Sequence, residues 1–161
     1  MKTNKIFIIV IFCLISSLSF AQQYKITGTW TLKERKAVSG PQYRNALPDK
    51  YTITRTKDSL TVQGSFNGEI PLSISFAFNG QVVTTRDPSG RKINSVLKWS
   101  ADHQTLTLIS KYSSPDNERT LDFTRIRTIK LLGADLSLDV RSEEANPDHQ
   151  SWEAVGTYAK Q

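Results

Sequence analysis

The residues best suited to chemistry lie on one extended segment, Glu118–Leu132. Strict alternation along it places Arg125 and Arg127 on the face that also carries Phe123. An unpaired charge inside a protein costs at least several kcal/mol, so two inward arginines would require an anionic partner. Tyr158, on the last extended segment, offers a hydroxyl to the same interior. We therefore hypothesise that Arg125, Arg127 and Tyr158 hold the acidic head of an amphipathic ligand.

A second register remains open for this segment. A β-bulge near Arg125 would turn Ile126 inward and direct both arginines to solvent. Ile126 favours burial, and bulges are frequent where strands bend. The alternation alone does not choose between these two arrangements.

Aromatic side chains recur on the apolar faces, where they would line a pocket or fill a core. The pocket wall that we predict is made of Phe76, Phe78, Trp99 and Phe123. Ten strands can enclose a small ligand, whereas eight strands can be filled by side chains alone. A carrier should contain a cavity of roughly 300 Å³ or more. A filled interior would favour binding through the loops instead.

Signals for catalysis and for metal binding are weak. His103 and His149 fall in predicted turns, without a second histidine at metal-ligand spacing. Glu143 and Glu144 precede Asp148-His149, but a solvated loop accounts for them. No nucleophile-elbow, P-loop or dinucleotide-binding motif occurs. We expect a protein that is not an enzyme and that uses no metal or cofactor.

The elements that must position these residues are strands, because no stretch of twelve residues keeps a helical period. Two Asn-Gly pairs, Asn67-Gly68 and Asn79-Gly80, are strong hairpin signals. The ten predicted strands are Tyr24–Glu34, Lys50–Thr56, Ser59–Phe66, Glu69–Phe78, Gln81–Arg86, Arg91–Ser100, Thr105–Tyr112, Glu118–Leu132, Asp135–Ser142 and Gln150–Lys160.

Consecutive hairpins predict an antiparallel up-and-down sheet. Closing that sheet into a barrel removes its unpaired edges and gives the apolar faces a common interior. The segment Lys36–Asp49, with Gly40-Pro41 and Pro48, is predicted to be a loop across one mouth. The predicted fold class is an all-β barrel of about 8–10 strands.

The first residues predict export. Lys2 and Lys5 precede the apolar run Ile6–Ile15, which is too short to span a bilayer, and Ala21 suits cleavage by a signal peptidase. We therefore divide the chain into a signal peptide, residues 1–21, and one domain, residues 22–161. The only cysteine of the 161 residues, Cys13, falls inside the leader, so the mature domain would contain no disulfide. The net charge of +6 comes from basic residues scattered among acids, which indicates a solvated surface.

Two short motifs resemble those of a known superfamily. Gly28-Thr29-Trp30 opens the first strand, and Leu97-Lys98-Trp99-Ser100-Ala101-Asp102 leads into Leu106-Thr107-Leu108. With the strand meander, these motifs resemble the calycins, above all small exported lipocalin-like bacterial domains, with a strand count like that of fatty-acid-binding proteins. The resemblance implies that Trp30 plugs the closed end of the barrel beside Gly28. The basic residue that stacks on this tryptophan in lipocalins has no clean equivalent here, and Lys160 is the nearest candidate.

These observations favour one function over two others. We expect a monomeric barrel, in the periplasm or outside the cell, that binds a small hydrophobic or amphipathic ligand such as a fatty acid. It would bind no nucleic acid and would not span a membrane. The alternative is an envelope interaction module with a filled core, which binds a protein or glycan through its loops. A barrel enzyme with a buried acid or base is a distant third.

Overall fold

A computed structural model of the chain describes residues 25–41, 43, 46–66 and 71–161. The predicted signal peptide, residues 1–21, and the Asn67-Gly68 turn lie outside these ranges. Within them, no helix is long and apolar enough to cross a bilayer.

All ten predicted strands are present, with ends shifted by a few residues. They are β1 (Gly28–Ser39), β2 (Lys50–Arg55), β3 (Ser59–Ser65), β4 (Leu72–Ala77), β5 (Val83–Arg86), β6 (Lys92–Trp99), β7 (Thr105–Ser113), β8 (Leu121–Leu132), β9 (Asp135–Glu144) and β10 (Trp152–Lys160).

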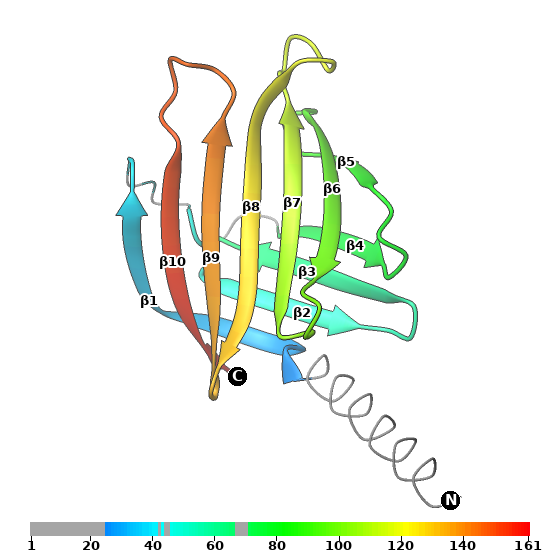
Figure 1. Cartoon of the computed structure of the whole chain (residues 1–161), viewed down its shortest axis with the longest axis vertical. Helices are drawn as coiled ribbons and strands as arrows, with labels where there is room; N and C mark the ends of the chain where they lie inside the picture. The colour runs from blue at the N-terminus through cyan, green and yellow to red at the C-terminus, as the bar shows by residue number, and fades with distance from the viewer. Residues whose placement is uncertain (1–24, 42, 44–45, 67–70) are drawn as a thin grey trace, which may run out of the picture.

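The strands form a single antiparallel sheet in the order β4-β3-β2-β1-β10-β9-β8-β7-β6-β5. Strands that follow one another in the chain pair with each other, except β4 and β5, which lie at the two edges of the sheet. A further ladder joins β1 to β10 and brings the two ends of the domain together. The sheet curls so that β2, β3 and β4 pass behind the long strands β6 to β10 (Figure 1). The predicted all-β, up-and-down, nearly closed barrel is therefore confirmed. No ladder joins β4 to β5 among the described residues.

Strand β1 makes the corner between the two parts of the barrel. Its first residues, Gly28 to Thr31, pair with β2, while the part from Trp30 onward pairs with β10. Register shifts at Leu32/Glu34 and Ala37/Ser39 let the strand bend. Because β1 continues through these bulges to Ser39, the loop predicted from Lys36 starts only after that residue.

Alternation decides what fills the barrel. On β9, Leu136, Leu138, Val140 and Ser142 are buried, while Asp139 and Arg141 between them are partly or fully exposed. The core is apolar toward the ends of β8 and β10 and polar in one band nearer the other end, where Ser95, Ser110 and Ser142 are buried. That polar band is where the candidate site lies.

Candidate ligand-binding site

The register of β8 turns both arginines inward. Arg125 pairs with Ser110 of β7 and Ser142 of β9, which are each 0% exposed. Arg127 pairs with Leu108 and Val140, which are also buried. Directly paired residues share a face of the sheet, so the arginines point into the barrel.

Of the two registers left open by the sequence, the structure has the inward one. No bulge interrupts the pairing of β8 from Phe123 to Leu132. The one irregularity between β7 and β8 lies outside that stretch, at Tyr112/Ser113. Ile126, between the arginines, therefore lies on the outer face, where it remains partly exposed.

A small cavity lies against the two guanidinium groups. Its volume is about 60 Å³. Arg125, Arg127 and Leu108 form one wall, and Tyr51, Val62 and Ile74 from β2, β3 and β4 are on its lining as well. The remaining lining residues are Ala46, Pro48, Gly64 and Phe66. The cavity therefore joins a cationic side to an apolar side, as an amphipathic anion would require.

Aromatic rings surround the Arg125 guanidinium, and no acid among the described residues forms an ion pair with it. Its guanidinium carbon lies 4.9 Å from the ring centre of Phe123, 5.2 Å from that of Trp152 and 5.5 Å from that of Tyr112. Its buried Nε has no hydrogen-bond partner. Burial, and then the charge of Arg127, lower the pKa of Arg125 below its ordinary value.

The charge of the arginine pair is left uncompensated at short range. Among the described residues, no carboxylate oxygen lies within 4.0 Å of a nitrogen of Arg125 or Arg127. Glu144 favours the charged form of Arg125 only from a greater distance. Its own oxygens accept from Ser142 at 2.9 Å and lie 3.9 Å from His149.

Two tyrosines lie beside the arginine pair, and one of them, Tyr51, belongs to the cavity wall. Tyr51 is 3% exposed, lines the cavity and has a hydroxyl without a partner. Burial raises its pKa to about 12, although the charge of Arg127 acts in the opposite direction. Burial also raises the pKa of Tyr112, but the charges of Arg127 and Arg125, with a hydrogen bond from Arg127, outweigh it and lower that pKa overall.

Tyr51 is the residue that the sequence reasoning did not assign to the acidic head. The signal in the sequence was the alternation of Tyr51 and Ile53 along the second predicted strand, which places both side chains on one face. Both side chains are buried in the structure. Tyr158, assigned to that role, lies elsewhere. It is 0% exposed, pairs with Leu136 far along β10, and donates its hydroxyl to the Pro48 carbonyl at 2.8 Å. A donor already engaged with the backbone is not free for a ligand.

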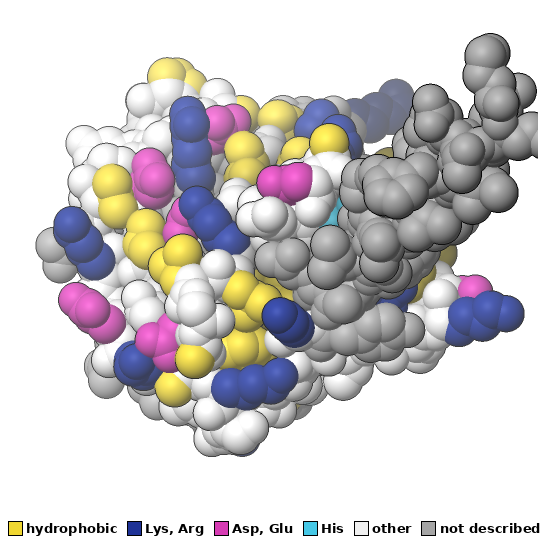
Figure 2. All heavy atoms as spheres, turned by 60° about the horizontal axis from the view of Figure 1, so that its bottom comes forward, with side chains coloured by type: hydrophobic (Ala, Val, Ile, Leu, Met, Phe, Trp, Pro, Cys, Tyr) yellow, Lys and Arg dark blue, Asp and Glu magenta, His cyan; other side chains and the backbone are white. Residues whose placement is uncertain are grey.

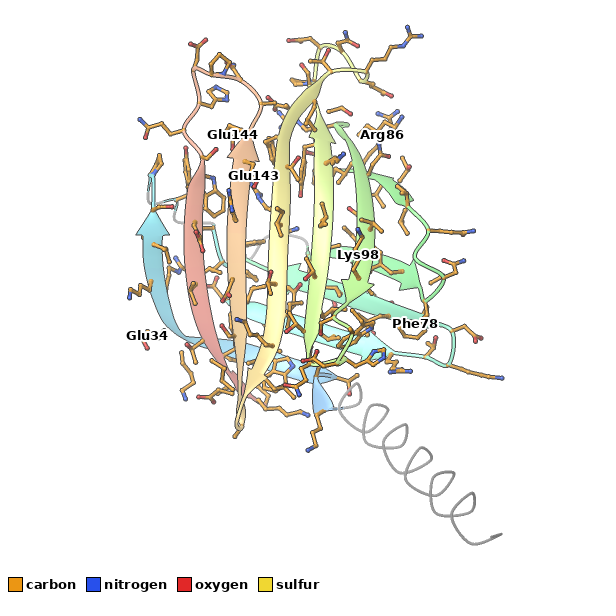
Figure 3. The ribbon with its side chains drawn as sticks, viewed as in Figure 1. Glu34, Phe78, Arg86, Lys98, Glu143 and Glu144 are labelled. Carbon is orange, nitrogen blue, oxygen red and sulfur yellow. The ribbon has the colours of Figure 1, made fainter. Side chains whose placement is uncertain are left out.

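The four predicted wall aromatics fall in four different places. Phe123 stacks on Tyr112 at 4.3 Å and lines the mouth of the barrel. Phe76 is 1% exposed in the apolar core and does not reach the cavity. Trp99 pairs with Leu106, near the opposite end from Phe123. Phe78 follows the end of β4 and projects from the rim, with Arg55 over its ring at 4.8 Å (Figure 3).

A wider, open hollow lies above the cavity. Its volume is about 450 Å³, and Arg125, Phe123, Glu144 and Trp152 are on its lining together with Tyr43, Arg91, Asp122 and His149. Figure 3 shows Glu143 and Glu144 at the upper end of β9, beside this mouth. Since Arg125 lines both spaces, its side chain separates the mouth from the cavity. No group of three potential metal ligands occurs within the described ranges.

Comparison with solved structures gives the fold. A mutant of the fluorescent protein UnaG superposes with a TM-score of 0.56 at 16% identity, covering 86% of this chain and 97% of that one. As-p18, an extracellular fatty acid binding protein, superposes with a TM-score of 0.56 at 11% identity, covering 85% and 96%. The chain has the calycin fold. No protein-family model matches the sequence, and no curated protein matches it significantly.

The closed end of this calycin barrel is built around Trp30. Its ring is 1% exposed, and its Nε1 donates to the Ile26 carbonyl at 2.9 Å. The Lys160 Nζ lies 5.3 Å from the centre of the Trp30 ring. Gly28 has φ +133°, and a Cβ there would lie 2.8 Å from the Lys160 Cε, so glycine leaves room for that side chain.

The surface of this end is a mixture of charges. Figure 2 shows basic and acidic side chains interspersed with small apolar areas on the face that lies at the bottom of Figure 1. Lys33 and Asp135 form an ion pair of 2.6 Å, and Lys130 and Asp139 one of 3.6 Å. Exposed pairs of this kind add little stability.

Proposed function

We propose that this calycin barrel binds a small amphipathic anion, with the acidic group on Arg125, Arg127 and Tyr51. The apolar part of the ligand would lie against Val62 and Ile74. The observation that carries the proposal is the inward-facing, partly buried arginine pair that has no carboxylate partner within the described structure.

In the described structure the arginine pair carries a charge that no neighbouring acid balances. Removing charged groups from water is costly, and neighbouring like charges add to the cost. An anion in the cavity would receive hydrogen bonds from charged donors, each worth about 1.5–3 kcal/mol. The unpartnered Tyr51 hydroxyl would donate to the same anion. Ligand binding thus supplies the partner that the fold omits.

The fold neighbours support a binding role over a catalytic one. As-p18 is described as a fatty acid binding protein and UnaG as a fluorescent protein. In this chain, the described groups around the cavity are two cations, one phenol and apolar side chains, which would bind and orient a ligand. We propose a non-enzymatic, monomeric carrier that needs no metal or cofactor.

Export is part of the proposal and depends on the leader. The basic start, apolar run and Ala21 of residues 1–21 support a cleaved signal peptide. Expression of the full chain, followed by cell fractionation and intact mass measurement, would test it. A mature protein that begins at Gln22 in the periplasm or medium is expected, whereas an uncleaved cytoplasmic chain would contradict it.

The binding proposal is tested by replacing the arginines. We expect Arg125→Gln/Arg127→Gln to weaken the binding of a carboxylate such as hexanoate at least tenfold, about 1.4 kcal/mol, in isothermal titration calorimetry. Arg141→Gln is the matched control, because Arg141 lies on the outer face, 61% exposed at its side chain. Unchanged affinity in the double variant would refute the assigned site.

One observation favours a second function. The cavity of about 60 Å³ is well below the roughly 300 Å³ at the lower end of small-molecule sites. A nearly filled barrel would suit an interaction module that binds a protein or glycan through its loops. A panel of anionic and neutral lipids that leaves the melting temperature unchanged would favour the module over the carrier.

A further inference from the structure

The size of the cavity restricts the class of ligand. We infer that the site selects compact monocarboxylates with short tails, of the size of butyrate to octanoate, and rejects the tail of a long-chain fatty acid. This inference depends on the proposed function, since it takes the arginine pair as the place where the carboxylate binds. It follows from what lies beneath the arginines.

The floor of the cavity is solid. One pair of residues below Arg127 along the sheet lie Leu106, Ile129 and Leu138, each 0% exposed. Leu136 and Tyr158, the next pair toward the closed end, are 0% exposed as well. A void that admits water beside any of these side chains would leave part of its surface accessible. The closed half of the barrel is therefore filled by its own residues.

The space for a ligand tail along β8, from the arginines toward the closed end of the barrel, is correspondingly short. Arg125 and Arg127 are two residues apart on one face, and Ile129 is two residues further, so each step covers about 6.6 Å. A carboxylate held by both guanidinium groups leaves one such step before its tail meets the Ile129 layer. The tail must instead turn across the barrel, toward Val62, Ile74 and Phe66.

Buried side chains also limit the space into which the ligand tail could extend across the barrel. Beyond Val62 and Ile74 the core contains Leu60 and Phe76, which are 0% and 1% exposed. On the loop side, Leu47 between the lining residues Ala46 and Pro48 is 0% exposed. Among the described residues, Arg125 lines both the cavity and the open hollow, so a longer tail that passes Arg125 leaves the enclosed apolar space. Tail length beyond the cavity thus adds no binding energy.

This contrasts with a barrel whose interior is mostly open. Each methylene that enters an apolar enclosure tightens binding about fourfold. In such a barrel the gain would continue through the whole chain of a long fatty acid. Here the gain should stop once the pocket between Tyr51, Val62 and Ile74 is full.

The test is a chain-length series measured by calorimetry on the mature protein, refolded to remove any bound molecule. Acetate, butyrate, hexanoate, octanoate, decanoate and palmitate are titrated below their micellar concentrations. We expect affinity to rise about fourfold per methylene at first and to reach a plateau or decline by octanoate. A steady gain from octanoate to palmitate would overturn the inference and leave the proposed function intact. Binding of none of these acids would refute the proposed function itself.

Two variants identify the wall that sets the limit. Ile74→Ala enlarges the cavity, so the plateau should move to longer acids. Leu136→Ala removes similar volume in the filled end and should leave the plateau in place. A plateau that stays fixed in Ile74→Ala, or that moves equally in both variants, would overturn the inference.

Discussion

Replacing Arg127 with methionine should stabilise the ligand-free protein. Methionine has a similar length and no charge, so it removes a partly buried cation that has no acid within 4.0 Å in the described structure. It also removes the repulsion between Arg127 and Arg125, because the charge of Arg127 is, after burial, the second cause that lowers the pKa of Arg125. A lowered pKa of a base means that the fold opposes its charged form, and that penalty applies at every pH below the pKa.

The magnitude follows from opposing contributions. Replacing buried charges by apolar groups of similar volume stabilises proteins by up to about 1–4 kcal/mol. The lost hydrogen bond from Arg127 to Tyr112 costs about 1 kcal/mol. Because Arg127 is partly exposed in the cavity, the lower part of the first range applies. The expected net gain is therefore up to about 1 kcal/mol, a rise in melting temperature of up to about 4 °C for a domain of this size.

The measurement is thermal and urea unfolding by circular dichroism, on protein refolded in a buffer without carboxylate or phosphate ions. Arg141→Met, on the outer face, is the control and should change stability by less than about 0.5 kcal/mol. Saturating hexanoate should stabilise the wild type and not Arg127→Met, so the difference in stability between the two proteins should shrink or change sign. Destabilisation of the ligand-free Arg127→Met protein by more than about 1 kcal/mol would refute the reasoning. It would mean that the fold itself depends on this arginine.

Three further predictions concern the groups around the site. Tyr51 keeps its proton to about pH 12 in the folded state, whereas the unfolded state releases it near pH 10.0. The free energy of unfolding should therefore fall between these pH values by about 1.4 kcal/mol per pH unit. Urea unfolding at pH 9 and pH 11 should show a smaller loss of stability in Tyr51→Phe than in the wild type. Tyr158→Phe removes the donor to the Pro48 carbonyl and should destabilise by about 1–2 kcal/mol at pH 7, with a destabilisation near zero contradicting that role. Gly156→Ala would place a Cβ 2.7 Å from the Tyr158 ring and 3.1 Å from Leu32, so we expect a loss of about 1–3 kcal/mol, measured as a lower urea midpoint at constant slope.

Strand positions were predictable because the signals for a strand lie within a short stretch of sequence. Each of the ten predicted strands is present, since alternation with a period of two and Asn-Gly turns are properties of a few neighbouring residues. The exception is informative. β1 continues to Ser39 through two register shifts, and a bulge breaks the alternation by which the sequence could have shown it.

The composition of the site was predictable only in part. Parity along one strand correctly turns Arg125 and Arg127 to one face, but it cannot tell which face is inside or whether a bulge intervenes. Tyr51 and Tyr158 both occupy inward positions. The height of each in the barrel depends on how its strand is staggered against strands distant in the chain. That stagger places Tyr51 beside the arginines and ties Tyr158 to Pro48.

The sequence by itself determined the class of fold, the order of the strands and the presence of two arginines on an otherwise apolar face. These follow from local alternation, turn residues and the requirement to close an exposed sheet. Only the tertiary structure decided the volume of the interior and the partners of each polar group. Both depend on side chains that converge from β2, β3, β4, β7 and β8, where a packing difference of one methyl group changes what can enter.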